Sequence, residues 1–161
     1  MTLGMKALEL ARQSVGVHED TDNWGVWIRV YLAFVGIRTP APWCAAFVTF
    51  KVHQAAKALG VKATMPKTGY CPTIWNWAVK NHHTLAVPQP GCLFLVWNDS
   101  LHRYAHVGFV AEVHGSYFTS VEGNSNNTGS REGKGVCSNT RRWSLGDAKF
   151  AFAKFAFAEV D

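Results

Sequence analysis

A run of two prolines and one glycine near the middle of the chain separates two halves with different apolar patterns. This run is Pro88-Gln89-Pro90-Gly91, and such a run interrupts both helices and central strands. Before it, apolar residues follow helical spacing, which predicts helices at residues 3–15, 23–35, 42–59 and 73–80. After it, short apolar runs predict strands at residues 91–97, 105–113, 117–124, 136–143 and 149–160. Helices followed by strands indicate an α+β fold, with N-terminal helices packed on a C-terminal antiparallel β-sheet.

The size and composition of the chain indicate one globular domain over residues 1–161. Apolar residues make up 48% of the chain and charged residues 17%, which excludes a disordered tail. No apolar stretch approaches the roughly 20 residues that a membrane-spanning helix needs. Residues 1–6 also lack the charged-then-apolar layout of a secretory signal. We therefore expect synthesis in the cytoplasm, no signal peptide and no stable membrane insertion.

The charge of the chain favours a polyanionic partner. Its formal net charge is +5, which suits either nucleic acid or an anionic cell wall. The basic residues are dispersed, and Arg141-Arg142 is the only adjacent pair. Because no nucleic-acid motif of defined geometry accompanies them, we do not expect a nucleic-acid partner.

A cysteine near the expected start of the third helix is the candidate nucleophile. Cys44 lies in the run Pro42-Trp43-Cys44-Ala45-Ala46-Phe47-Val48. Proline is favoured at the first helical position, so we expect the helix to begin at about Pro42 and Cys44 to lie in its first turn. Unpaired N–H groups and the helix dipole there lower the pKa of a thiol and favour the thiolate. The alternative is an inert buried cysteine.

The candidate base is a histidine in an apolar strand. His106 lies in Ala105-His106-Val107-Gly108-Phe109-Val110, where a neutral imidazole can accept a thiol proton and return it to a leaving amine. The alternative is a core histidine with satisfied hydrogen bonds. Among the other histidines His102 is the closest competitor, but Arg103 and Tyr104 indicate that it lies in the turn before the strand.

Two residues near the end of the next strand can orient the histidine. Glu122 and Asn124 are two positions apart, so in a regular strand they point to the same face. Either can bond the far ring nitrogen of His106, while the other polarises the substrate or assists an oxyanion hole with the Cys44 N–H. The alternative is that Gly123-Asn124 only begins a turn.

Other features complete the candidate site and its surroundings. Trp43 is the best candidate for a wall of the cleft, and Tyr70 is a weaker one. The cysteine spacing contains no CxxC pair, so we expect no metal site. If Cys44 is the nucleophile, at most one disulfide can form among the other three cysteines, Cys71, Cys92 and Cys137. We expect residues 125–135 to form a surface loop and the final strand to break near Lys154.

The runs around Cys44, His106 and Glu122-Gly123-Asn124 resemble the CHAP family of cysteine, histidine-dependent amidohydrolases and peptidases, within the papain-like group that includes NlpC-type hydrolases. With the upstream run Gly16-Val17-His18-Glu19, the resemblance covers most of residues 5–125. It implies a papain-like fold and a single CHAP-like catalytic domain. Pro90-Gly91-Cys92 departs from the common Pro-Gly-Asp of the family, and residues 37–41 lack the acidic ligands of its calcium sites.

The resemblance implies a peptidoglycan hydrolase similar to phage endolysins. It would cleave an amide bond as an N-acetylmuramoyl-L-alanine amidase or as an endopeptidase of the stem peptide or cross-bridge, with no cofactor. We expect a monomer whose partner is peptidoglycan and which acts at the bacterial cell wall or in the periplasm. The alternatives are a non-catalytic wall-binding or phage structural module of the same fold, an acyltransferase, and a toxin delivered by a secretion apparatus.

Overall fold

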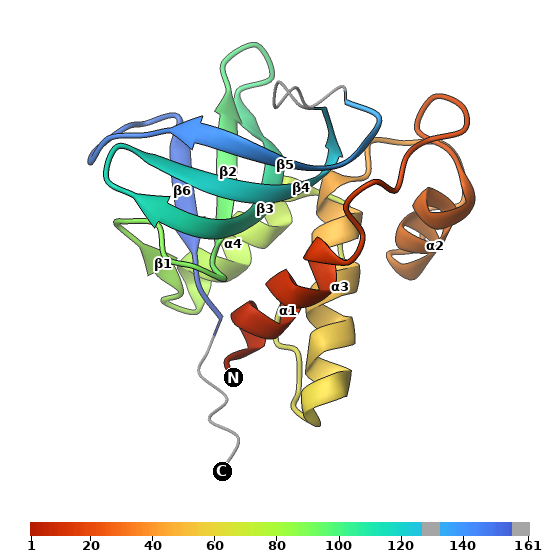
Figure 1. Ribbon diagram of the computed structural model, residues 1–161, viewed down its shortest axis with the longest axis horizontal. Helices are drawn as coiled ribbons and strands as arrows, with labels where there is room; N and C mark the ends of the chain where they lie inside the picture. The colour runs from red at the N-terminus through yellow and green to blue at the C-terminus, as the bar shows by residue number, and fades with distance from the viewer. Residues whose placement is uncertain (127–132, 156–161) are drawn as a thin grey trace.

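The computed structural model describes residues 1–126 and 133–155, and it places helices on a mixed-length antiparallel sheet (Figure 1). The helices are α1 (Leu3–Arg12), α2 (Val26–Phe34), α3 (Cys44–Leu59) and α4 (Cys71–Lys80). The strands are β1 (Thr84–Leu85), β2 (Leu93–Asn98), β3 (Arg103–His114), β4 (Tyr117–Ser125), β5 (Gly135–Arg142) and β6 (Phe150–Ala153). They form one sheet in the order β1-β6-β2-β3-β4-β5. The expected α+β layout, helices first and then an antiparallel sheet, is confirmed.

The ends of the helices follow local capping chemistry. The Thr2 hydroxyl accepts a hydrogen bond from the Met5 N–H at 3.2 Å and caps α1. Gly60 adopts a left-handed conformation with φ 68° and ends α3, as expected. None of the helices in the described part of the chain is both long and apolar enough to cross a lipid bilayer.

The sheet is buried on both faces. Leu93, Leu95 and Val107 belong to the core on the helical side, hereafter the helix-side core. Phe94, which lies between the two leucines, belongs to a second cluster on the opposite face, hereafter the sheet-side cluster: Cys92, Phe94, Val110, Phe118 and Phe152. Because neighbouring residues of β2 enter different clusters, the strand is apolar at consecutive positions, which is typical of a sheet covered on both sides.

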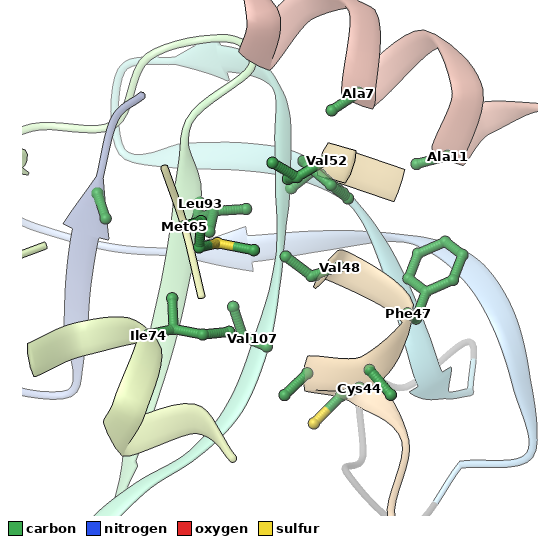
Figure 2. Close-up of a cluster of buried hydrophobic side chains, with 14 of the residues drawn as sticks. Ala7, Ala11, Cys44, Phe47, Val48, Val52, Met65, Ile74, Leu93 and Val107 are labelled. Atoms are coloured by element: carbon green, nitrogen blue, oxygen red, sulfur yellow. The ribbon is translucent and has the colours of Figure 1, made fainter. Parts of the chain in front are cut away.

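The helix α3 is the centre of the helix-side core. Its residues Phe47, Val48 and Val52 are fully buried, and Figure 2 shows them between α1 and the strands that carry Leu93 and Val107. The second helix, α2, packs on α3 at the side of the molecule (Figure 1). Since α3 is enclosed by other elements, the position of its first residue is fixed relative to β3 and β4.

The chain changes face just after the last strand, where the sequence indicates. Phe150 and Phe152 pack in the sheet-side cluster, whereas Phe155 lies in the helix-side core. The strand ends at Ala153, which confirms the break expected near Lys154. Residues 156–160 of the expected strand and residues 127–132 of the expected loop lie outside the described residues. The short strand β1, which pairs with β6, was not expected from the sequence because two residues carry no periodic pattern.

Gly91 is required where α1 meets the turn before β2. It has φ +81°, and a Cβ atom at this position would lie 2.9 Å from the backbone atoms Gly4 C and Met5 N. Gly36 has a similar φ of +84°, but nothing lies within 4 Å of its Cβ position. Both sites therefore need a left-handed backbone, and only Gly91 also needs the absence of a side chain.

Substitution of alanine at these two glycines separates the two requirements. We expect Gly36→Ala to lower the free energy of unfolding by about 1–2 kcal/mol through the left-handed backbone alone. Gly91→Ala should lower it by about 1–3 kcal/mol more, because the backbone of α1 must move. Urea unfolding of both variants measures the difference, and equal losses would contradict the close contact between Gly91 and α1.

Candidate active site

Cys44 is the first residue of α3. The helix begins at Cys44 and not at Pro42 as expected; Trp43 is the N-cap residue, and its carbonyl accepts the Phe47 N–H at 2.9 Å. Trp43 and Cys44 therefore lie closer to the start of the helix than the sequence indicates. This shift places the Cys44 sulfur at the end of the helix dipole where a negative charge is most favourable. Figure 2 shows this side chain at the end of α3.

His106 and Glu122 form a buried pair across two neighbouring strands. Nε2 of His106, on β3, lies 2.6 Å from Oε1 of Glu122, on β4. The two residues are 3% and 0% exposed, so water cannot replace this contact. An ionised carboxylate can accept a hydrogen bond but cannot donate one, so Nε2 carries the proton. In the neutral ring, Nδ1 is then the unprotonated nitrogen, and it makes no hydrogen bond within the described residues.

Further hydrogen bonds hold the Glu122 carboxylate in place. Nε of Arg141, on β5, donates to Oε2 at 3.0 Å, and Nη2 of the same side chain donates to Oε1. The Ser120 hydroxyl also donates to Oε2. Burial alone would raise the pKa of Glu122, but His106 and Arg141 hold this pKa well below its usual range. The carboxylate is therefore ionised although it has no contact with solvent.

Cys44 and His106 shift the ionisation of each other. The Cys71 thiol, together with His106, lowers the pKa of Cys44 well below its usual value, although burial opposes this change. Burial would lower the pKa of His106, but the Cys44 thiolate and the Glu122 carboxylate raise it to about 9. Both changes favour a thiolate beside an imidazolium at neutral pH, which is the reactive form of a cysteine nucleophile.

Cys71 is a neighbour of Cys44 that no motif in the sequence marks as part of the site. The two sulfur atoms lie 3.8 Å apart, and Cys71 is the first residue of α4 just as Cys44 is the first residue of α3. A thiol at this distance can donate its proton toward a thiolate. The sequence held a usable indication, because Pro72 follows Cys71 and proline favours the first helical turn.

Asn124 binds the residue before α3 and forms no hydrogen bond with His106 within the described residues. Its Oδ1 accepts the Trp43 N–H at 2.8 Å, and its Nδ2 donates to the Gly133 carbonyl at 2.8 Å. The backbone at Asn124 is left-handed with φ 54°, and the strand pairing shifts between Glu122 and Ser125. The rule that places alternate strand residues on one face does not hold across such a bulge. Of the two residues expected to orient His106, the structure brings only Glu122 to it.

Two glycines allow this arrangement. A Cβ atom on Gly108 would lie 2.8 Å from both Glu122 Cγ and a ring atom of Phe94. A Cβ atom on Gly123 would lie 2.7 Å from the Phe47 ring. The absence of side chains at these positions thus makes room for Glu122 beside β3 and lets β4 approach α3.

The two expected substrate-contacting residues have different surroundings. Trp43 is fully buried, its ring stacks on Tyr31, and its Nε1 donates to Glu19 at 2.9 Å. It is a core residue and cannot form a wall of the cleft, which corrects the expectation from the sequence. Tyr70 is 51% exposed and lines a hollow of about 170 Å³ together with Cys44 and Arg103.

A second hollow also has Ala105 in its lining. Its volume is about 250 Å³, and its lining includes Trp97, His106, Arg141 and Lys149. Cys44 thus faces one hollow and His106 faces the other. No short motif marks Trp97, Arg103 or Arg141 as site residues, because it is the pairing of their strands that brings them to the site.

The remaining chemistry of the site involves thiols without disulfides. No disulfide joins the four cysteines, all of which lie in the described part of the chain. Burial raises the pKa of Cys92 to about 12, so this thiol is protonated and unreactive. Within residues 1–126 and 133–155, no three side chains of His, Cys, Asp or Glu gather where a metal ion could bind.

Comparisons with known proteins place the site inside a recognised sequence region. Residues 36–124 match the model of the CHAP domain family, and this segment includes Cys44, His106, Glu122 and Asn124. The crystal structure of Ly7917 is similar, with a TM-score of 0.51 and 17% identity over 95% of this chain and 62% of that chain. The crystal structure of Ly7917 with the hydrolyzing product of MDP gives a TM-score of 0.48 and 16% identity over 93% and 62%. No curated protein matches the chain.

The family match covers more than half of the 161 residues. At 17% identity, the first structural likeness shows a shared fold. The chain spans 62% of the length of both solved structures.

Replacement of Glu122 tests the origin of the histidine pKa. We expect Glu122→Gln to lower the pKa of His106 from about 9 by roughly one to three units, because a negative neighbour is removed and the charge of Arg141 remains. The pH dependence of the His106 ring signals in nuclear magnetic resonance spectra measures this change. If His106 donates a proton in a reaction, the rate of that reaction should begin to fall on the alkaline side of its pH profile at a correspondingly lower pH.

Asn124→Ala is the matched control for this measurement. It removes an equally buried polar side chain two residues away but no charge and no hydrogen bond to His106. The pKa of His106 should therefore stay near its original value. A shift in the Asn124 variant as large as that in the Glu122 variant would contradict the assignment of Glu122.

Proposed function

Because this chain belongs to the CHAP domain family, we propose that it is a peptidoglycan hydrolase that cleaves an amide bond with Cys44 as the nucleophile. The observation that carries the proposal is the buried Cys44–His106–Glu122 arrangement beside two hollows. Nucleophile, base and orienting carboxylate are the parts that thiol-dependent acyl transfer requires. The net charge of +5 suits an anionic wall.

The first half of the reaction forms a thioester. The Cys44 thiolate attacks the carbonyl carbon of the amide, and negative charge develops on the carbonyl oxygen. The first N–H groups of α3 have no partner inside the helix, so the Cys44 N–H is available to stabilise this oxygen. His106, protonated at both ring nitrogens, gives the proton on Nδ1 to the leaving amine, and the C–N bond breaks.

The second half releases the acyl group. Neutral His106 accepts a proton at Nδ1 from a water molecule, which attacks the thioester carbonyl. The thiolate then leaves as the carboxylic acid product forms, and the proton on His106 restores the initial pair. Glu122 keeps Nε2 protonated throughout, and Arg141 keeps Glu122 ionised. These groups belong to the chain, and the reaction as proposed needs no cofactor.

Asn124 acts on the nucleophile in this proposal. Its hydrogen bond to the Trp43 N–H fixes the residue that precedes Cys44, and the bond from Trp43 to Glu19 fixes the same residue from the other side. These contacts support the placement of Cys44, since a shift of about 1 Å in a nucleophile is enough to slow a reaction strongly.

Cys44→Ala tests the proposed function. We expect the wild-type protein to digest purified sacculi and to produce new free amines from amide bonds, identified by mass spectrometry. The Cys44 variant should lose essentially all turnover while it keeps its fold and its affinity for the wall.

Cys92→Ala is the matched control, because Cys92 is also a buried cysteine but its thiol stays protonated. This variant should retain turnover. Unchanged lysis by the Cys44 variant would remove Cys44 from the mechanism. Wall binding without digestion by the wild-type protein would favour a non-catalytic module of the same fold, and transfer of the acyl group to an added amine would favour an acyltransferase.

A further inference from the structure

Two thiols of the site lie close enough to react with each other. The sulfur atoms of Cys44 and Cys71 are 3.8 Å apart, and both residues line the same hollow of about 170 Å³. A disulfide bond is about 2.0 Å long, so the two sulfur atoms together must move by about 1.8 Å to form one. Rotation about the two Cα–Cβ bonds is a movement of this size. The pair is therefore placed for reversible bond formation.

The other two cysteines are placed differently. Cys92 belongs to the sheet-side cluster on the opposite face of the sheet, and the sulfur of Cys137, on β5, donates a hydrogen bond to the Ser125 carbonyl. Neither residue lines the hollow that contains Cys44. Burial raises the pKa of both thiols. Of these three cysteines, Cys44 is therefore the one that reacts as a thiolate at neutral pH.

The surroundings of Cys44 favour its reaction with small peroxides. A thiolate is oxidised by peroxides far more readily than a thiol, and a proton donor assists the departure of the second oxygen. The His106 imidazolium is such a donor, because Glu122 holds the proton on Nε2 and leaves the proton on Nδ1 for transfer. The hollow gives a molecule as small as hydrogen peroxide a path to a residue that is only 6% exposed.

We propose that Cys44 and Cys71 form a peroxide-sensitive redox site, in which Cys44 is oxidised and Cys71 traps it in a reversible disulfide. The inference goes beyond the proposed hydrolysis, because the bond can form whether or not the protein cleaves peptidoglycan. Only its consequence rests on the proposed function. While the disulfide is present, the sulfur of Cys44 is not a nucleophile, and hydrolysis stops.

The oxidation proceeds in two balanced steps. In the first step, the Cys44 thiolate attacks one oxygen of hydrogen peroxide and becomes a sulfenic acid. The S–O bond forms, the O–O bond breaks, and the departing hydroxide leaves as water with the Nδ1 proton of His106. In the second step, the Cys71 sulfur attacks the Cys44 sulfur, the S–S bond forms, and the S–O bond breaks. The hydroxide leaves as water with the Cys71 proton, so the two sulfur atoms lose two electrons and one peroxide becomes two water molecules.

Cys71 decides what becomes of the sulfenic acid. Without a neighbouring thiol, a sulfenic acid reacts with further peroxide to a sulfinic acid, which dithiols do not reduce. A disulfide, in contrast, returns to two thiols by exchange with a dithiol such as dithiothreitol. A thiol 3.8 Å from the sulfur of Cys44 therefore preserves the nucleophile when the protein meets an oxidant.

Peptide mapping of the whole protein after treatment with hydrogen peroxide tests this inference. Cleavage after lysine and arginine places Cys44 and Cys71 in separate peptides, residues 39–51 and 68–80. In the wild-type protein, we expect a disulfide to join these two peptides, with the loss of two hydrogen atoms, and dithiothreitol to separate them. Digestion of sacculi should fall by roughly 10-fold or more as the linked pair forms, because the nucleophile is lost, and it should return on reduction.

Cys71→Ser removes the trapping thiol and keeps a side chain of similar size. In this variant, peroxide should add the two oxygen atoms of a sulfinic acid to Cys44, with no linked pair and no recovery in dithiothreitol. Cys92→Ala is the matched control, because it removes a buried thiol that lies away from the hollow. It should form the linked pair as the wild-type protein does.

The outcomes separate the redox site from the proposed function. The inference is overturned if Cys44 of the wild-type protein is not oxidised, if it becomes a sulfinic acid with no linked pair, or if its disulfide joins Cys92 or Cys137 instead. A linked pair that leaves the digestion of sacculi undiminished overturns the effect on activity. If the linked pair forms and is reduced as expected but the reduced protein never digests sacculi, the redox site stands and the proposed function fails.

Discussion

The ionised carboxylate of Glu122 inside the protein is the constraint on which the rest of the site depends. A buried charge is unfavourable unless charged and polar partners surround it. Those partners are His106 on β3, Ser120 on β4 and Arg141 on β5. Three neighbouring strands must therefore keep their register, and Gly108 must lack a side chain so that Glu122 fits beside Phe94. The sheet thus serves to hold one carboxylate and, through it, one imidazole.

Cys44, the proposed nucleophile, belongs to the helical layer, which is joined to the sheet at a few points. Asn124 binds the backbone of Trp43, and Gly123 lets β4 approach Phe47 of α3. Cys44 and Cys71 begin two different helices, so the positive ends of two helix dipoles converge on one pair of sulfur atoms 3.8 Å apart. Helix termini, a neighbouring thiol and the imidazolium therefore all favour the thiolate.

The sequence predicts the structural features that arise from neighbouring residues. It does not predict those that arise from contacts between distant segments. Helical and strand periodicity predicted the layers, and the phenylalanine repeat predicted the break near Lys154. The sequence does not reveal that Trp43 is a core residue, because a tryptophan beside a cysteine has the same sequence pattern whether it is buried or exposed. The alternation of strand residues places Asn124 on the same face as Glu122, because the sequence does not show the bulge between Glu122 and Ser125. Arg141 and Arg103 reach the site only through strand pairing, which no short motif records.

The central claim is that Cys44 is already a thiolate at neutral pH because His106, Cys71 and the start of α3 stabilise its charge. The most direct test is the ultraviolet absorbance of the thiolate as a function of pH, taken as the difference between the wild-type protein and Cys44→Ala. We predict that the difference signal appears well below the usual thiol pKa of about 8.5 and is complete by neutral pH. A signal that develops only in the alkaline range, with the midpoint of an ordinary cysteine, would contradict the thiolate–imidazolium pair.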